Sequence, residues 1–406
     1  MRTIIQKNND LGAILFKMEN ILILGRQKNI ALAELASLYG SENFRLLNDV
    51  CVSTTLKTKD IDFRRLGGSI KMAEIIGQYQ TTEWVEIEKI LHKDIGQLLN
   101  LPVEGKMNLG ISTYDLDVNI NQLKNLTIQL KKSIKKFGQS IRLVPNQSLQ
   151  LNSAQIIHNR LLTAKGIELL LIRNGQSLVI ARTTHEQDID SYSKRDYDRP
   201  YRDSRVGMLP PKLAQILINL ANPEQNTVLL DPFCGTGVVL QEALLDGLDA
   251  YGTDLEPRMI DYSAGNLKWL ENIYQIDNKY SLETEDATGH QWKHFDNVAS
   301  ETYLGQAYSS YPEQVRLTTN INNCNTIISK FLDNIHDQLP EGKRMALALP
   351  AWKERNTKSF ISLPLLDHLE ELGYNRLSFS INSNDDLFYH REGQIVARQL
   401  IVITRK

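Results

Sequence analysis

The sequence predicts an α/β protein whose C-terminal half is a doubly wound parallel sheet and whose N-terminal half is an α+β module. Helical patterns alternate with short apolar strands from residue 227 onward, which is typical of a parallel sheet with helices on both faces. Shorter strand and helix units fill residues 19–188. A chain of 406 residues also exceeds the usual size of one compact core, so more than one domain is expected.

The N-terminal module begins in residues 19–40 with an apolar strand followed by an amphipathic helix. Gly25 separates the strand from the helix. Similar short patterns follow: a strand at 50–53, a glycine turn with apolar alternation at 66–79, a helix at 84–99, a strand at 106–113 and a hairpin at 168–182. Such mixed units favour an α+β arrangement of the ferredoxin-like type.

A lysine-rich helix is predicted over residues 119–138, where apolar residues recur at steps of three and four. Its last turns contain Lys131, Lys132, Lys135 and Lys136. These lysines either form a solvated face that complements the helix dipole or form a patch that contacts phosphates.

Residues 190–205 join the two halves and place five cationic side chains between three tyrosines. An interdomain linker has this kind of charged composition. Arginines on phosphates with tyrosines beside them would equally suit RNA held between the domains. The sequence supports both interpretations.

A glycine-containing turn, DPFCGTG, lies between the first predicted strand and helix of the C-terminal half. Gly235 and Gly237 allow the backbone to turn sharply and to lie against a ligand. The next strand ends in Asp254, which is placed to accept hydrogen bonds from a ribose diol. Strand, glycine turn, helix, strand and acid together predict a nucleoside-binding site. The GxGxxG pattern of NAD sites and the GxxxxGK[ST] pattern of triphosphate sites are both absent from this turn.

The alternation continues to the end of the chain. Helices are expected at 208–220, 259–274 and 314–338, and strands at 279–285, 297–300 and 344–349. Residues 376–381 and 395–404 predict two final strands joined by a turn, which gives an antiparallel C-terminal hairpin.

The DPFCGTG turn resembles the first motif of class I S-adenosylmethionine-dependent methyltransferases, and within them the enzymes that methylate exocyclic amino groups. This resemblance implies a Rossmann-like fold and S-adenosyl-L-methionine as cofactor. It places Asp231 at the methionine end of the cofactor and Asp254 at its ribose, and Asp286 matches the position that usually holds the adenine amino group. The turn residues Pro232, Phe233, Gly235 and Gly237 complete the expected cofactor site.

The catalytic motif of such enzymes is usually Asp or Asn followed by Pro-Pro-Tyr at the end of the fourth strand. Here the corresponding stretch is NVASETYLG, in which both prolines are absent. Tyr303 matches the tyrosine that stacks on the target base, and Glu301 stands in for the acid, with Ser300 as the other choice. A carboxylate accepts two hydrogen bonds from an amino group, and a guanine edge offers N1–H and N2–H together. The alternative is that Glu301 only caps a loop.

Several stretches outside the catalytic motifs, among them LGGSIKMAEII and SKRDYDRPYRDSR, resemble the THUMP-containing guanosine-N2 tRNA methyltransferases. That resemblance implies a ferredoxin-like part at 1–60, a THUMP-like RNA-binding domain at 61–188, a linker at 189–206 and the methyltransferase domain at 207–406. It implies methylation of the N2 amino group of a guanosine in tRNA or another structured RNA. A small activator protein and the oligomeric state stay open.

Composition narrows the class of protein further. A net charge of −2 gives no global nucleic-acid signature, so any basic surface is local. The three cysteines are far apart in sequence, which argues against a disulfide framework and suits a reducing compartment. The eight histidines are also scattered, so no metal site is expected. No apolar run approaches the length of a membrane span. We therefore expect a cytoplasmic protein without a membrane partner or a metal.

Two rival functions share these motifs. A DNA adenine amino methyltransferase has the same motif order, although it normally keeps NPPY or DPPY and needs no THUMP-like part. An RNA-binding protein with an inactive methyltransferase domain is the other, since the motif around Glu301 is irregular.

Overall fold

The computed structural model describes residues 17–101, 104–203, 208–379 and 387–406. These residues group into two compact units. The first takes its residues from Met1–Ile23, Asn43–Ile61 and Lys71–His185, and the second from Leu24–Glu42, Asp62–Ile70 and Glu186–Lys406. Residues 204–206 of the predicted linker and 380–381 of a predicted strand lie outside the described residues.

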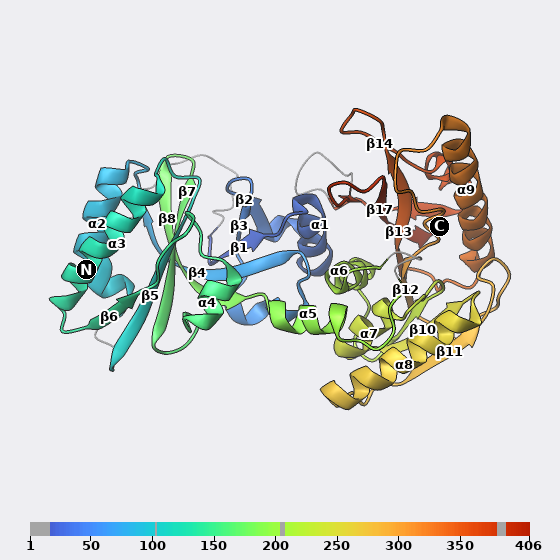
Figure 1. Cartoon of the computed structure of the whole chain (residues 1–406), viewed down its shortest axis with the longest axis horizontal. Helices are drawn as coiled ribbons and strands as arrows, with labels where there is room; N and C mark the ends of the chain where they lie inside the picture. The colour runs from blue at the N-terminus through green and yellow to red at the C-terminus, as the bar shows by residue number, and fades with distance from the viewer. Residues whose placement is uncertain (1–16, 102–103, 204–207, 380–386) are drawn as a thin grey trace. The chain divides into compact units, whose positions relative to one another are not determined.

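The first unit is built on an eight-stranded sheet with the order β2-β3-β1-β4-β8-β7-β5-β6 (Figure 1). Its strands are β1 (Asn20–Leu24), β2 (Phe44–Leu46), β3 (Cys51–Thr54), β4 (Ser69–Tyr79), β5 (Lys106–Tyr114), β6 (Ser140–Leu143), β7 (Gly166–Asn174) and β8 (Ser177–Glu186). The hairpin predicted at 168–182 is the antiparallel pair β7 and β8, which turns at Gly175 and Gln176.

Two helices, α2 (Trp84–Leu98) and α3 (Ile120–Lys135), lie side by side over β5, β6 and β7 in Figure 1. They share an apolar core with β5, β7 and β8. The predicted amphipathic helix at 119–138 is confirmed as α3, because Asn119 closes a capping box at its N-terminus and the apolar stripe is buried. The short helix α4 (Ser153–His158) follows β6.

A buried ion pair lies inside the first sheet. Lys71 donates from Nζ to both carboxylate oxygens of Glu168 at 2.7 and 2.8 Å, and both side chains are almost fully buried. The hydroxyls of Ser112 and Thr183 each donate to the same carboxylate at 2.6 Å. Four charge-assisted hydrogen bonds therefore fix the central strands to one another.

Replacing Glu168 with glutamine is expected to destabilise the first unit by about 3 to 5 kcal/mol, because the change removes the charge that compensates the buried Lys71 ammonium. Hydrogen exchange of the β7 and β8 amides checks this locally. Glu86→Gln, which alters an exposed pair with Lys89, serves as the control and should leave exchange unchanged. Unchanged protection of β7 in Glu168→Gln would contradict the prediction.

The second unit contains a doubly wound sheet with the order β11-β10-β9-β12-β13-β17-β15. Its main strands are β9 (Val228–Asp231), β10 (Asp249–Asp254), β11 (Tyr280–Thr284), β12 (Asn297–Glu301), β13 (Arg344–Lys353), β15 (Tyr374–Arg376) and β17 (Val396–Arg405). The first five are parallel to one another, whereas β17 is antiparallel to both β13 and β15. Two short strands, β14 (Phe360–Ile361) and β16 (Phe388–Tyr389), pair with β13 and β17. The predicted fold class, with an antiparallel C-terminal end, is confirmed.

Helices cover both faces of this sheet. The helices α6 (Pro211–Ala221), α7 (Val238–Leu245) and α8 (Pro257–Tyr274) share one apolar core, and α9 (Gln314–His336) belongs to the other. The strands supply alternate residues to the two cores: Leu229 of β9 belongs to the first and Leu230 to the second. Parallel strands buried on both faces require near-continuous apolar sequence, which is the pattern that predicted them.

A buried carboxylate ties the helix α1 (Lys28–Tyr39) into the second unit. Glu34 accepts hydrogen bonds from the backbone N–H groups of Gly67 and Gly68 at 2.9 Å, and from Asn219 of α6 at 2.7 Å. Burial raises the pKa of Glu34 to about 7. These local contacts explain why residues distant in sequence from the second sheet group with it.

The segment predicted as a linker contains a helix, α5 (Ile189–Tyr197), whose Arg195 forms a buried ion pair with Glu242 of α7. Strand β15 ends at Arg376, whereas the prediction began a strand there. Among the described residues, no helix has the length and apolar character required to span a bilayer.

Candidate active site

A cavity of about 820 Å³ lies at the carboxyl ends of β9, β10 and β12. In doubly wound sheets this edge is where ligands bind. The lining includes eight residues singled out from the sequence: Asp231, Pro232, Phe233, Gly235, Asp254, Asp286, Glu301 and Tyr303. The other two predicted residues, Gly237 and Ser300, are not among the lining residues.

The glycine turn follows β9 and has the backbone conformation that its sequence requires. Gly235 has φ +51° and Gly237 has φ +79°, values that residues with a side chain rarely adopt. A Cβ on Gly237 would lie 2.9 Å from Oγ of Ser263, whereas a Cβ on Gly235 would meet no atom within 4 Å. Gly235 therefore leaves backbone open toward the cavity, as a cradle for a nucleoside requires.

Asp231, the last residue of β9, is only 2% exposed. It accepts hydrogen bonds from Oγ of Ser300 at 2.6 Å and from the backbone N–H of Phe233 at 3.2 Å. Burial raises the pKa of Asp231 to about 7, and the nearby charges of Asp254 and Glu301 act in the same direction. Ser300 thus holds Asp231, and its own side chain is fully buried.

Asp254 is the last residue of β10, and Asp286 follows the end of β11. Both line the same cavity. Asp254 accepts from the backbone N–H of Gly235 and of Glu256, both at 2.9 Å, and burial raises its pKa. Asp286 is exposed and accepts from the backbone N–H and hydroxyl of Thr288, which lower its pKa. Each carboxylate retains lone pairs for a further donor.

The corner after β12 carries a buried ion pair. Glu301, the last residue of β12, accepts a hydrogen bond from Nε of Arg398 on β17. The Arg398 side chain is 7% exposed and that of Glu301 is 14% exposed. The guanidinium occupies one carboxylate oxygen, Oε1, so the second oxygen of Glu301 is the one left to accept hydrogen bonds in the cavity.

Tyr303 follows this corner and is 45% exposed, so its ring is available to a flat ligand. The loop behind it is fixed by Gly305, which has φ +75°, and by Asn320 of α9. Asn320 accepts from the backbone N–H of Gln306 at 3.0 Å and donates to its carbonyl at 3.3 Å. A Cβ on Gly305 would lie 2.4 Å from the same Asn320 oxygen, so only glycine fits.

Sequence reasoning missed Arg398 and Lys330. Arg398 lies on the antiparallel strand β17, and no local motif links it to Glu301. Lys330 of α9 lines the cavity, and its positive charge contributes to the lowered pKa of Asp286. A signal for Arg398 does exist in the sequence, since Arg398 and Gln399 interrupt a stretch that is otherwise apolar from Val396 to Ile403.

Comparison with known proteins places a methyltransferase domain on this site. Residues 199–357 match a family model described as "RMKL-like, methyltransferase domain" (UPF0020), and this range contains the glycine turn, Asp254, Asp286 and the corner after β12. The chain is 28% identical over 156 residues to a tRNA (guanine(10)-N2)-dimethyltransferase of Methanothermobacter thermautotrophicus. The aligned residues make up 38% of this chain and 42% of that protein.

A tRNA (guanine(10)-N2)-dimethyltransferase of Pyrococcus abyssi is 30% identical over 200 residues, 48% of this chain and 56% of that protein. The chain thus spans about half the length of the curated relatives it matches. The crystal structure of TrmN from Thermus thermophilus aligns with a TM-score of 0.53 at 14% identity, over 96% of this chain and 100% of that one. At this identity the likeness concerns the fold alone.

Proposed function

We propose that the methyltransferase domain of this chain uses S-adenosylmethionine to methylate the exocyclic N2 amino group of a guanosine in tRNA. The observation that carries the proposal is the meeting of two groups of residues in one cavity. The open glycine turn and the acids Asp231, Asp254 and Asp286 form one side, and Glu301 and Tyr303 form the other.

The residues around the cavity fit this cofactor. Gly235 leaves room for a nucleoside against the backbone, and Asp254 would accept from the ribose hydroxyls. Asp286 would accept from the adenine amino group, and Asp231 would face the methionine end. When bound, S-adenosylmethionine supplies an electrophilic methyl group on a sulfonium centre.

The other side of the cavity would bind and orient the guanine. The lone pair of an arylamine is delocalised into its ring, so the amine attacks slowly unless its protons are held by acceptors. Glu301 would accept from the N2 amino group and Tyr303 would stack on the base. Arg398 would fix the Glu301 carboxylate in place and balance its charge. Proton loss can follow methyl transfer, so no strong general base is required.

Binding of the methyl donor, S-adenosylmethionine, is expected to weaken about eightfold when the pH falls from 7.5 to 6. The pKa of Asp231 is raised to about 7, so its carboxyl is mostly ionised at pH 7.5 and mostly protonated at pH 6. An ionised Asp231 attracts the cationic donor and a protonated one does not. Calorimetric titration of S-adenosylmethionine at both values measures the change. In Asp231→Asn the affinity should be low at both, and an equal pH dependence in that variant would contradict the assignment.

The unit that contains β5, β7 and α3 would bind RNA in this proposal, as a THUMP-like domain does. Its lysine-rich helix end supports that role, since Lys131, Lys132 and Lys135 lie on the exposed side of α3. Folded RNA hides most base edges, so recognition by shape and phosphate contacts is expected. The proposed compartment is the cytoplasm, where tRNA is modified.

The proposal is tested by incubating the purified chain with methyl-labelled S-adenosylmethionine and unmodified tRNA transcripts, then digesting the RNA to nucleosides. Label in N2-methylguanosine or N2,N2-dimethylguanosine is the expected result. Duplex DNA is included in parallel, since label in N6-methyladenine of DNA would establish the DNA methyltransferase alternative. Donor binding without transfer to either nucleic acid would establish an inactive domain.

A further inference from the structure

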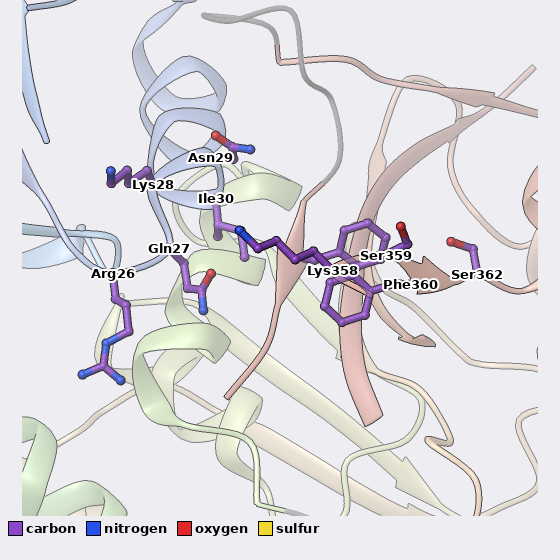
Figure 2. Close-up of a pocket in the computed structure, with 10 residues that line it drawn as sticks. Arg26, Gln27, Lys28, Asn29, Ile30, Lys358, Ser359, Phe360 and Ser362 are labelled. Carbon is purple, nitrogen blue, oxygen red and sulfur yellow. The ribbon is translucent and has the colours of Figure 1, made fainter. Parts of the chain in front are cut away.

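A second cavity in the methyltransferase unit lies outside the donor site. Its volume is about 590 Å³, and it is lined by the start of α1 and by the chain around β14 and β16. Figure 2 shows Arg26, Gln27 and Lys28 on one wall and Lys358 and Phe360 on the other, with the Lys358 side chain extended toward the first wall. All of these residues belong to the same compact unit.

The lining of this cavity is positively charged. Arg26, Lys28 and Lys358 contribute three cationic side chains, and none of the ten lining residues that the structure describes is acidic. The first turn of α1 also contains no acid, so its dipole adds potential of the same sign. On a chain with a net charge of −2, this concentration of cations is local and favours an anionic ligand.

An aromatic pair lies next to the cations. The rings of Phe360 and Phe388 stack with centroids 4.6 Å apart and an interplanar angle of 21°, and both rings are half-buried. Gln27 donates to the backbone carbonyl of His390 at 2.9 Å, which joins the α1 wall to the chain after β16. Cations beside a half-exposed aromatic surface match a nucleotide chain, which offers phosphates and base faces together.

The strand register places this cavity on the same edge of the sheet as the catalytic corner. Glu301 lies opposite Ala348 on β13, and β13 continues for five residues to Lys353, which pairs with Phe360. At about 3.3 Å per residue, Phe360 lies roughly 17 Å beyond the corner along the strand. On β17, Arg398 pairs with Tyr389, the residue after Phe388. The second cavity is therefore within reach of nucleotides that flank a base bound at Tyr303.

We infer that this cavity, defined by Arg26, Lys28, Lys358 and Phe360, binds the single-stranded RNA backbone that flanks the target nucleotide. Its cations contact phosphates, and Phe360 contacts a neighbouring base. This inference rests on the proposed RNA substrate and adds a contact site on the methyltransferase unit itself. A segment held here on one side of the target base keeps that base extruded toward Glu301.

The inference is tested by tRNA binding to the full-length chain as a function of salt, with the double variant Arg26→Gln/Lys358→Gln. Each lost phosphate contact on a single strand lowers the slope of log K against log salt by about 0.7, so the double variant should be shallower than the unchanged protein by about 1.4. Lys268→Gln, an exposed lysine of α8 paired with Glu271, is the matched control and should leave the slope unchanged. Donor affinity should be equal in all three proteins.

The outcomes separate this inference from the proposed function. If the unchanged protein methylates tRNA and the double variant binds tRNA with the same affinity and slope, the cavity has no role in RNA binding. A second outcome is that the unchanged protein binds tRNA but transfers no methyl group, while the double variant shows the predicted shallower salt dependence. In that case the inference stands and the methyltransferase proposal fails. A protein that binds no tRNA at all would overturn both.

Discussion

Replacing Glu301 with glutamine is expected to lower the rate of methyl transfer by a factor of about one hundred to one thousand, with donor affinity unchanged within about twofold. The amide has the same shape but lacks the charge that accepts the amino protons of guanine and pairs with Arg398. The loss should therefore appear in the single-turnover rate with saturating tRNA. Calorimetry with S-adenosylmethionine provides the binding constant.

Glu283→Gln is a matched control, because Glu283 is a half-buried carboxylate on β11 that pairs with Lys293 and lies outside the cavity lining. It should retain the full rate. Arg398→Lys keeps the charge but loses the fork of N–H donors, so it should reduce the rate less than Glu301→Gln does. Full activity of Glu301→Gln would mean that Glu301 only caps the loop after β12.

Replacing Asp254 with alanine is expected to weaken binding of S-adenosylmethionine by about one hundredfold. Hydrogen bonds to a charged acceptor contribute about 1.5 to 3 kcal/mol each, and the change removes the acceptor of the ribose hydroxyls. It also leaves the backbone N–H of Gly235 without its partner at 2.9 Å, which loosens the glycine turn. The dissociation constant is measured by calorimetry, and the fold is checked by circular dichroism.

Asp249→Ala tests whether this effect belongs to the cavity. Asp249 begins the same strand β10 at its opposite end, where it accepts from the backbone N–H of Lys279 at 2.8 Å. Its removal costs a comparable hydrogen bond far from the donor, so affinity should be retained. Equal affinities of Asp254→Ala and the unchanged protein would remove the ribose role of Asp254.

The parts of the site that are local in sequence could be predicted from it. The DPFCGTG turn contains its own strand end, glycines and helix start, and Asp254 follows at the end of the next strand. Positive φ at Gly235 and Gly237 is the conformation that the turn was expected to need. The doubly wound fold was predictable for a similar reason, since strands buried on both faces are apolar at nearly every position.

The parts that depend on long-range pairing could not be predicted in the same way. Glu301 and Arg398 are 97 residues apart in sequence. They meet because the sheet places β13 between β12, which carries Glu301, and β17, which carries Arg398. Likewise, nothing local indicates that Glu34 would bind Gly67 and Asn219 and so place α1 in the second unit. The buried hydroxyl of Ser300 holds Asp231, an arrangement that spacing along the chain does not reveal.

A crystal structure of the full-length chain with S-adenosylhomocysteine tests the central claim most directly, because the claim concerns one cavity. The account predicts the nucleoside against Gly235, its ribose hydroxyls on Asp254, and its sulfur on the side of the cavity formed by Asp231, Glu301 and Tyr303. A ligand bound elsewhere, or a sulfur that faces away from Glu301 and Tyr303, would contradict the account.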